Sequence, residues 1–389
     1  MTSHPRVLMV GPAPPPPGGV ASVTQSIVES DLAKRYEFVR FARNPSGARG
    51  RGVALRLFNA ALCRTFGFDG FVSLETRERL AAYRATLRGL DPPPDLAHIH
   101  CACGYDYWLG VAMVREARRH GIPSLLHTHG IWDVRVPSWS RAKQAVFRRT
   151  LRMPDRVAVL SESWLRWFAQ QVDAARLVVL RNPVDVGRFR PRDGSREDGL
   201  VRLLFVGAYD PELKGAYDIL AVAPEVVREA PNVRFVFVGN DVDRLEERFV
   251  RGTPLAPYFE FAGSKDAGEM VACFGRADVL LLPSHGEGLP IALLEGMAAS
   301  LPIVSCPVGG IPEAMHDPEN GILIAPGDRP ALARAILDLV SDPERRRRIG
   351  AANRGIAERQ FDIAHYVRVL GEVYEDLLAR RGSTRAAWR

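Results

Sequence analysis

Short apolar runs separated by longer amphipathic stretches recur along most of the chain. The runs Arg6–Val10, Val201–Val206 and Val233–Val238 are rich in Val, Leu and Phe, as expected of strands buried on both faces. Residues 20–28 instead carry valine and isoleucine at helical spacing. The alternation of these two patterns predicts βαβ units, and therefore parallel sheets with helices on both faces.

The same patterns place the other expected elements. Further strands are expected at Leu96–His100, Pro123–His127, Arg156–Leu160, Leu177–Leu180, Phe259–Ala262, Val279–Leu282 and Ile303–Cys306. Helices are expected at Ala54–Thr65, Glu75–Leu90, Trp108–His120, Tyr217–Ala230, Glu269–Phe274 and Ile291–Ala299, and after Asp328 and Asp342. The Gly- and Arg-rich segment Arg40–Arg56 is expected to be an exposed loop.

One segment interrupts the alternation. Residues 190–199 combine Pro, Gly, Asp and Ser with charges of both signs, which is typical of a linker. We therefore expect an α/β protein with an N-terminal Rossmann-like domain over 1–189 and a C-terminal one over 190–365. A last helix is expected within 366–389. Ligands of such parallel sheets bind at the carboxyl ends of the strands.

The composition restricts the class of protein. The chain has 389 residues, of which 47% are hydrophobic and 25% charged, and these values are ordinary for a globular protein. No apolar run approaches the roughly 18 residues that cross a bilayer, and the first residues do not resemble a secretory signal. Five cysteines do not form a disulfide framework. We expect a cytoplasmic, reduced protein.

Charge is unevenly distributed. Through residue 190 the chain has 28 Lys and Arg against 15 Asp and Glu, whereas the remainder has 24 against 30. A basic half is suited to an anionic partner: a membrane surface, a phosphorylated acceptor or nucleic acid. No DNA- or RNA-binding motif accompanies the charge, so we expect no nucleic acid. The arginines and tryptophans of residues 132–149 could form an acceptor or membrane face; a solvated surface is the alternative.

The segment 283–296 carries the most informative chemistry. Gly286 and Gly288 follow an expected strand, and Pro290 stands where a helix would begin. Glycines let backbone N–H groups approach a ligand, and a helix N-terminus adds free donors and a positive dipole end. This pattern indicates a site for a phosphate or diphosphate.

Two carboxylates flank that segment. Glu287 lies in the loop and Glu295 lies within the following helix. Carboxylates beside an anion site are unfavourable unless they accept hydrogen bonds from neutral hydroxyls, such as those of a sugar or a ribose. The alternative is a plain βα turn with Glu295 on a solvated helix face.

The spacing of these two acids resembles the Glu-x7-Glu motif of the retaining glycosyltransferase family 4, which has the GT-B fold. Other segments resemble the family in the same order along the chain: Gly18-Gly19, Asn182–Asp185, Val206–Gly215, Val308–Glu313, Asn320–Leu323 and Pro326–Asp328. The resemblance implies two Rossmann-like domains that face a central cleft, with a last helix that returns to the N-terminal domain.

The resemblance also implies roles for individual residues. Glu295 would bind the ribose hydroxyls of a nucleotide-sugar donor, Glu287 would face the transferred sugar, and Lys214 would neutralise the diphosphate. Backbone amides at Gly18-Gly19 and Gly288-Leu289 would complete the donor site. The family commonly has an arginine just after the first strand glycine of the second domain, where this chain has Ala208.

Histidines cluster in two expected strands. His98 and His100 alternate along one strand, so both rings should face the same side, and His127 and His129 lie at the end of the next. The resemblance implies that His129 contacts the donor sugar, with a catalytic role beside Lys214 and Glu287. With Cys101 and Cys103, these side chains could ligate zinc, but their spacings match no zinc motif. We therefore expect no metal and no cofactor.

These features together predict a metal-independent glycosyltransferase that moves a sugar from a nucleoside-diphosphate sugar to an acceptor hydroxyl with retention. The resemblance favours a sugar or lipid-linked acceptor of the kind used in polysaccharide assembly, with a contact to the membrane surface left open. Two alternatives remain: a nucleotide-sugar 2-epimerase of the same fold, and a non-catalytic protein that binds nucleotide sugars.

Overall fold

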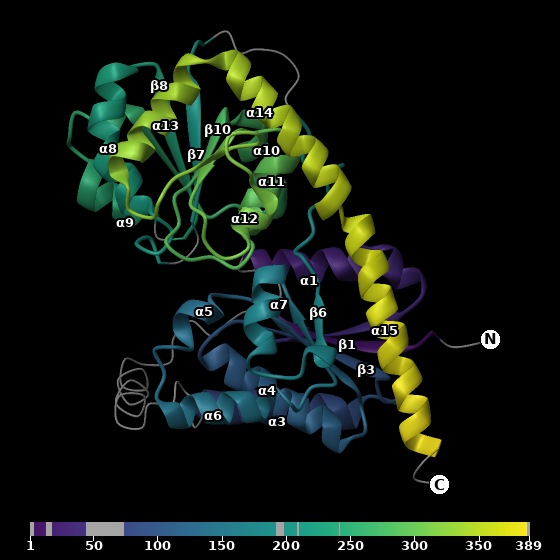
Figure 1. The fold of residues 1–389 in the computed structure, drawn as a ribbon. Helices are drawn as coiled ribbons and strands as arrows, with labels where there is room; N and C mark the ends of the chain where they lie inside the picture. The colour runs from purple at the N-terminus through teal and green to yellow at the C-terminus, as the bar shows by residue number, and fades with distance from the viewer. Residues whose placement is uncertain are drawn as a thin grey trace. The chain divides into compact units, whose positions relative to one another are not determined.

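A computed structural model describes residues 4–12, 18–43, 74–191, 198–207, 210–240 and 242–386. The chain forms two compact units (Figure 1). The first contains Val20–Arg181 and the C-terminal part from Tyr366, together with the N-terminal strand. The second contains Asn182–His365 and the short segment Pro17–Gly19.

The first unit is built on a parallel six-stranded sheet of order β2-β1-β3-β4-β5-β6. Its strands are β1 (Arg6–Gly11), β2 (Glu37–Ala42), β3 (Leu96–Cys101), β4 (Ser124–Thr128), β5 (Arg156–Val159) and β6 (Leu177–Val179). Its helices are α1 (Gly19–Glu29), α3 (Leu74–Gly89), α4 (Tyr105–Arg119), α5 (Trp132–Arg135), α6 (Arg141–Thr150), α7 (Glu162–Ala169) and most of α15 (Ile363–Ala386).

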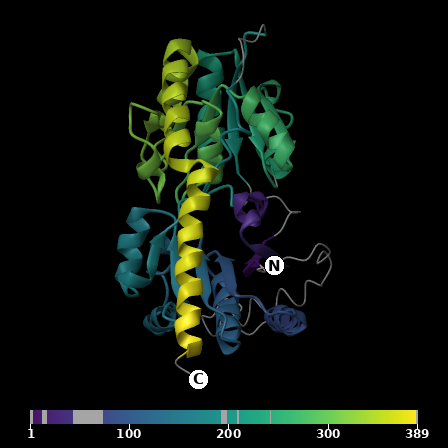
Figure 2. The same ribbon diagram turned by 90° about the vertical axis from the view of Figure 1, so that its right-hand side faces the viewer.

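Helix α15 belongs to the first unit although it comes last in the sequence. It runs alongside that unit in both views (Figures 1 and 2). Tyr374 is fully buried, and its hydroxyl lies 2.7 Å from His98 Nδ1 on β3. Asp376 pairs with Arg156 of β5 at 2.8 Å. The helix is therefore attached to the sheet by buried aromatic packing and by charge.

The second unit has a parallel sheet of order β12-β11-β10-β7-β8-β9. Its strands are β7 (Val201–Val206), β8 (Val233–Val238), β9 (Phe259–Gly263), β10 (Val279–Leu282), β11 (Ile303–Ser305) and β12 (Ile322–Leu323). Its helices are α8 (Ala216–Glu229), α9 (Val242–Leu245), α10 (Ala267–Arg276), α11 (Ile291–Ala298), α12 (Ile311–Ala314), α13 (Arg329–Ser341) and α14 (Pro343–Ile356).

Helices cover both faces of this second sheet, with α8 and α13 on one side and α10 and α11 on the other (Figure 1). Phe205, Phe235 and Phe237 are almost completely buried in the core on the first side. Burial of such side chains stabilises each by roughly 1.5–3 kcal/mol. The strand order reverses between β7 and β10, and the loops that follow these two strands therefore meet at one edge of the sheet.

The sequence pattern predicts an exposed loop over Arg40–Arg56. This prediction is wrong for its first residues, because β2 continues to Ala42. The strand was not recognised because it is an edge strand whose residues are mostly exposed or half-buried, with charges among its apolar positions. The expected helix Ala54–Thr65 lies outside the described residues. The structure places the junction between the units at Arg181/Asn182, whereas the sequence pattern places it in the linker that begins at 190.

Among the described residues no helix combines the length and the apolar character needed to cross a membrane.

The close packing of α14 gives a stability prediction. At Gly350 an added Cβ would lie 2.0 Å from the carbonyl oxygen of Ser300, so Gly350→Ala should lower the free energy of unfolding by about 1–3 kcal/mol. Gly275 in α10 has nothing within 4 Å, and Gly275→Ala should leave stability unchanged or raise it by up to about 1 kcal/mol. Urea unfolding of both variants measures the difference, and equal midpoints would contradict this packing.

Candidate functional site

The reversal of strand order in the second sheet brings two site-bearing loops together. Lys214 lies in the segment after β7, and Glu287 lies in the loop after β10. The Lys214 ammonium lies 2.7 Å and 2.8 Å from the two carboxylate oxygens of Glu287. The Ser284 hydroxyl also donates to Glu287 at 2.9 Å. The structure therefore joins two residues predicted to act on a shared ligand.

This ion pair is largely withdrawn from solvent. Only 7% of the Glu287 side chain and 27% of the Lys214 side chain are exposed. Removing one partner from such a pair leaves a poorly solvated charge and is strongly destabilising. Each residue therefore depends on the other, and both loops must be held accurately for the pair to form.

Two glycines permit the close approach of these loops. Gly215 follows Lys214 with φ +75°, and a Cβ there would lie 2.1 Å from the Pro283 carbonyl oxygen. Gly309 has φ +57°, and a Cβ there would lie 2.0 Å from the Glu287 carbonyl oxygen. Any other residue at either position would combine backbone strain with a steric clash.

Sequence reasoning missed a polar network that braces the same loops. His285 Nε2 lies 2.7 Å from Asp218 in the first turn of α8, and Arg329 donates to the other Asp218 oxygen at 2.8 Å. Burial acts to raise the pKa of Asp218, but these hydrogen bonds outweigh it and lower the pKa below its ordinary value. The main-chain N–H of His285 also donates to Leu213, next to Lys214, at 2.8 Å. Polar residues at a loop and at a helix start were the only sequence signal.

Helix α11 begins beside the ion pair. Pro290 precedes its first residue and offers no side-chain cap, so the first-turn N–H groups are not capped by that residue. The Leu289 carbonyl accepts from the Asn182 side chain at 2.7 Å, and the Gly288 carbonyl accepts from the Gly310 N–H at 2.6 Å. These bonds fix the backbone at the two positions that the sequence assigned to a phosphate site.

Glu295 lies one turn into α11 and is half-buried. Burial raises the pKa of its carboxyl group to about 7, while the charge of Arg188 acts in the opposite direction. Near neutral pH the group therefore interconverts between a neutral and an ionised form. Its environment differs sharply from that of Glu287, whose carboxylate is paired with an ammonium.

The Gly18-Gly19 segment falls with the second unit. Gly19 begins α1, and a Cβ added there would lie 3.0 Å from Cγ1 of Ile291, the first residue of α11. A side chain at position 19 would therefore crowd the start of that helix.

The departure from the family pattern, Ala208, lies outside the described residues, as does Tyr209.

His129 lies just beyond β4 in the first unit and is 4% exposed. Its Nε2 atom lies 3.0 Å from His100 Nδ1. His98 and His100 stack with ring centroids 4.3 Å apart, which confirms that both side chains face the same side of β3. Burial lowers the pKa of all four rings, those of His98, His100, His127 and His129, far below the ordinary value. The rings are therefore neutral near pH 7.

The histidines also bear on metal binding. One ring nitrogen each from His98, His100 and His127 lies within 4.8 Å of the others. The rings, however, are stacked or tilted by no more than 34° between any two of the three. His98 and His127 are nearly coplanar, and their facing nitrogens are hydrogen-bonded to each other at 3.3 Å. A metal ion would have to replace that bond, because imidazole lone pairs lie in the ring plane.

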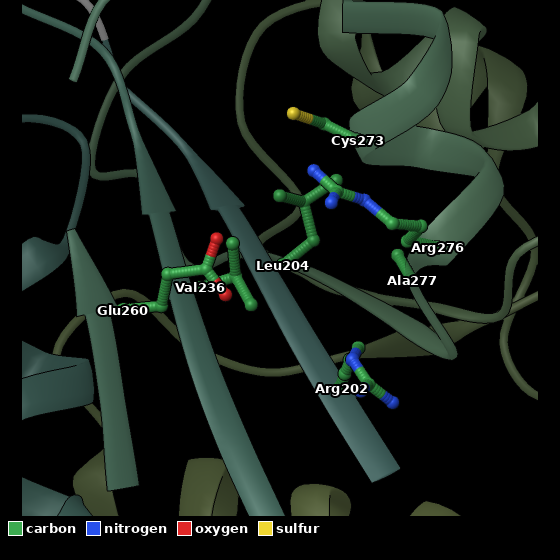
Figure 3. A pocket seen from close by; sticks show the side chains of 7 residues that line it. All are labelled: Arg202, Leu204, Val236, Glu260, Cys273, Arg276 and Ala277. Atoms are coloured by element: carbon green, nitrogen blue, oxygen red, sulfur yellow. The ribbon is translucent and has the colours of Figure 1, made fainter. Parts of the chain in front are cut away.

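A separate cavity of about 130 Å³ lies between the second sheet and α10. It is lined by Arg202, Leu204, Val236, Glu260, Cys273, Arg276 and Ala277 (Figure 3). In the close-up, the side chains of Glu260 and Arg276 extend toward the space between sheet and helix (Figure 3). None of the predicted site residues lines it.

Comparison with known proteins adds family information to this geometry. Residues 18–183 match the profile described as "Glycosyl transferase 4-like domain", and residues 201–342 match "Glycosyl transferases group 1". A glycogen synthase of Mycobacterium tuberculosis is 29% identical over 308 residues, which cover 74% of this chain and 70% of that one. A phosphatidyl-myo-inositol mannosyltransferase of the same species is 32% identical over 57% of this chain and 59% of its own length.

Solved structures share the fold at low identity. Sucrose-phosphate synthase from Thermosynechococcus elongatus superposes with a TM-score of 0.76 at 17% identity, covering 97% of this chain and all of that one. HepE from Anabaena, in complex with UDP-glucose, gives 0.70 at 18% identity over 96% of this chain and all of its own. The two family profiles and the paired parallel sheets agree, and the chain belongs to the glycosyltransferase 4-like, group 1 family: it is a glycosyltransferase with the GT-B fold.

Proposed function

We propose that this glycosyltransferase transfers a sugar from a nucleoside-diphosphate sugar to an acceptor hydroxyl with retention of configuration. The second unit binds the donor and the first unit binds the acceptor. The observation that carries the proposal is the Lys214–Glu287 pair, which sets an ammonium 2.7 Å from a carboxylate at the carboxyl edge of a parallel sheet. A diphosphate needs the ammonium, and a sugar needs the carboxylate.

Departure of the diphosphate is the demanding step, because negative charge grows on the leaving oxygen. Lys214 supplies a positive charge near the point where that charge develops. The N–H groups at the start of α11, near Gly288 and Leu289, supply oriented donors and the positive end of the helix dipole. The Gly18-Gly19 amides complete the phosphate site in this proposal. A side chain at Gly19 would contact Ile291 at the start of α11 tightly.

The two acids divide the hydroxyls of the donor between them. Glu287 accepts hydrogen bonds from the transferred sugar while Lys214 shifts toward the phosphate, so that the pair of the free enzyme is replaced by two contacts with the donor. Glu295 accepts from the ribose hydroxyls in its ionised form. For Glu287 the hydrogen bonds to the sugar replace its bonds with Lys214, so they add little net affinity. The contact of Glu295 with the ribose is a charge-assisted hydrogen bond, which is worth about 1.5–3 kcal/mol.

Retention follows from attack on the face that the leaving group vacates. The bond from the anomeric carbon to the diphosphate oxygen breaks, and a bond to the acceptor oxygen forms on the same side of the ring. The proton of the acceptor hydroxyl passes to the departing diphosphate oxygen, so no enzymatic nucleophile is required. His129 contacts the donor sugar beside the reaction centre. Lys214 supplies the positive charge at the diphosphate, and no metal is part of the proposal.

The acceptor is proposed to be a sugar or lipid-linked hydroxyl presented at an anionic membrane surface. Arg141, Arg148 and Arg149 are exposed on α6, and Val146 on the same helix is 38% exposed. Val134 on neighbouring α5 is 55% exposed. Basic side chains interspersed with apolar ones suit an anionic lipid surface, and the relative named as a phosphatidyl-myo-inositol mannosyltransferase takes, by that name, a lipid acceptor.

A nucleotide-sugar 2-epimerase is the alternative of the same fold. The family profiles and the relatives named above describe transferases, which favours transfer. Incubation with a nucleotide sugar alone distinguishes the two reactions. An epimerase converts the nucleotide sugar into its 2-epimer without an acceptor, whereas the transferase only hydrolyses it slowly.

The ionisation of Glu295 gives a pH prediction. With a pKa of about 7, its ionised fraction rises about tenfold from pH 6 to pH 8, and affinity for the donor should rise with it. A thermal-shift panel of UDP, GDP, ADP and their sugars identifies the donor. Titration calorimetry with that sugar nucleotide, whose diphosphate does not titrate in this range, should show the rise in the wild type and not in Glu295→Gln. The exposed-site control Glu319→Gln should behave as wild type; identical profiles for all three proteins would exclude this role.

Glu287 should affect turnover more than binding. Glu287→Gln keeps the shape of the side chain but removes the charge that orients the sugar and Lys214, and we expect a roughly 100-fold lower rate of donor cleavage with a Kd within about threefold of wild type. Ser284→Ala removes a single hydrogen bond to Glu287 and should cost about tenfold or less. Glu287→Gln at wild-type rate would refute the assignment.

The basic face of α6 gives a binding prediction. The triple change of Arg141, Arg148 and Arg149 to Glu should lower binding to phosphatidylglycerol-containing vesicles at least tenfold in co-sedimentation, because each basic residue near such a surface contributes about 1 kcal/mol. The same change at the exposed Arg334, Arg347 and Arg348 of the second unit is the matched control. Equal loss in both triples, or equal binding to phosphatidylcholine vesicles, would show that α6 is not the contact.

A further inference from the structure

Four buried histidines lie side by side in the first unit. His98 and His100 belong to β3, His127 to β4, and His129 follows β4. Three of the side chains are fully buried and His129 is 4% exposed. Burial of polar groups is unfavourable unless they are hydrogen-bonded, and a polar row inside an otherwise apolar sheet is a departure from simple packing that commonly marks function.

The four rings form two hydrogen-bonded pairs that stack on each other. His98 Nε2 lies 3.3 Å from His127 Nδ1, and His100 Nδ1 lies 3.0 Å from His129 Nε2. The planes within each pair differ by 11° and 17°. Between the pairs, His98 stacks on His100 with centroids 4.3 Å apart, and His127 lies 4.5 Å from His129. Contact on the ring faces and a bond at the ring edge leave His129 little rotational freedom.

The bond between His100 and His129 also constrains the tautomers. All four rings are neutral, so each ring carries one N–H and one lone pair, and one ring of each pair must donate. His100 Nε2 is buried and has no partner among the described residues. A buried N–H without an acceptor is rarer than an unpaired acceptor, which favours a lone pair on His100 Nε2. The proton of His100 then lies on Nδ1 and is donated to His129 Nε2.

We propose that His100 is the positioning residue of His129: it holds the ring through the Nδ1–H···Nε2 bond and sets the Nδ1–H tautomer, so that His129 presents an N–H donor at the carboxyl end of β4. His129 makes no other side-chain hydrogen bond with the described residues, and its Nδ1 is therefore available to an oxygen of the donor sugar. This inference rests on the proposed role of His129 in the reaction.

The tautomer is tested directly by long-range ¹H–¹⁵N spectra of protein labelled at histidine, with His129 assigned from the signals lost in His129→Gln. We expect Nδ1–H His129 in the wild type. In His100→Asn the amide nitrogen can occupy the place of Nδ1, so His129 should keep its Nδ1–H tautomer. In His100→Leu, His129 should become a mixture of its two tautomers. An Nε2–H form in the wild type, or an unchanged signal in His100→Leu, would overturn the proposal.

Kinetics test whether this positioning matters for the reaction. His100→Leu should lower the rate of donor cleavage at least tenfold with little change in the KM for the donor, and His100→Asn should restore most of the rate. His98→Leu is the matched control, because His98 is equally buried on the same strand but does not bond to His129. Equal loss in both leucine variants would reduce His100 to a packing role. If the tautomer responds as expected and His129→Gln itself keeps the wild-type rate, the proposed role of His129 fails while the positioning stands.

Discussion

The ion pair between Lys214 and Glu287 imposes the strictest requirement on the second unit. Two charges that are only 27% and 7% exposed lose hydration, and their mutual attraction offsets that loss only if they meet at hydrogen-bond distance. The residues are separated by 73 positions and belong to loops after different strands. The reversal of strand order between β7 and β10 is what makes their meeting geometrically possible. Gly215 and Gly309, each in a left-handed conformation, then allow the backbones to approach.

The two acids of the Glu-x7-Glu motif, Glu287 and Glu295, lie in different electrostatic environments. Glu287 has an ammonium and a hydroxyl as partners, whereas burial raises the pKa of Glu295 to about 7 with only the more distant charge of Arg188 opposing it. Two acids in one motif can therefore serve different hydroxyls, because Glu287 is paired with an ammonium whereas Glu295 becomes charged as the pH rises through about 7. The spacing of the motif alone does not reveal this difference.

The fold was predictable where burial decides the pattern. Strands β7, β8 and β10 begin and end at the predicted residues, because a central parallel strand must be apolar on both faces and so stands out as a continuous run. Strand β2 lies at an edge of the sheet, carries Glu37 and Arg40, and gives no such run. The pairing of α15 with the first unit depends on contacts between distant segments, such as Tyr374 with His98, which no local pattern encodes.

The candidate site was predictable only in part, for the same reason. Glycines, a proline at a helix start and two spaced acids are local features, and they located the loop and helix after β10. The Asp218–His285 bond, the ion pair of Glu287 and the pairing of His100 with His129 join residues from separate elements. Alternation along β3 placed His98 and His100 on one side, but it could not show which ring bonds to which.

The two units hold their polar groups by different physical means, and the difference suits the chemistry of glycosyl transfer. The second unit uses full charges, an ammonium against a carboxylate, where in the proposed reaction a diphosphate is stabilised as its charge grows. The first unit uses imidazoles that burial keeps neutral near pH 7. A neutral ring has one N–H and one lone pair, so it can orient a hydroxyl through a hydrogen bond without adding a positive charge to the first unit.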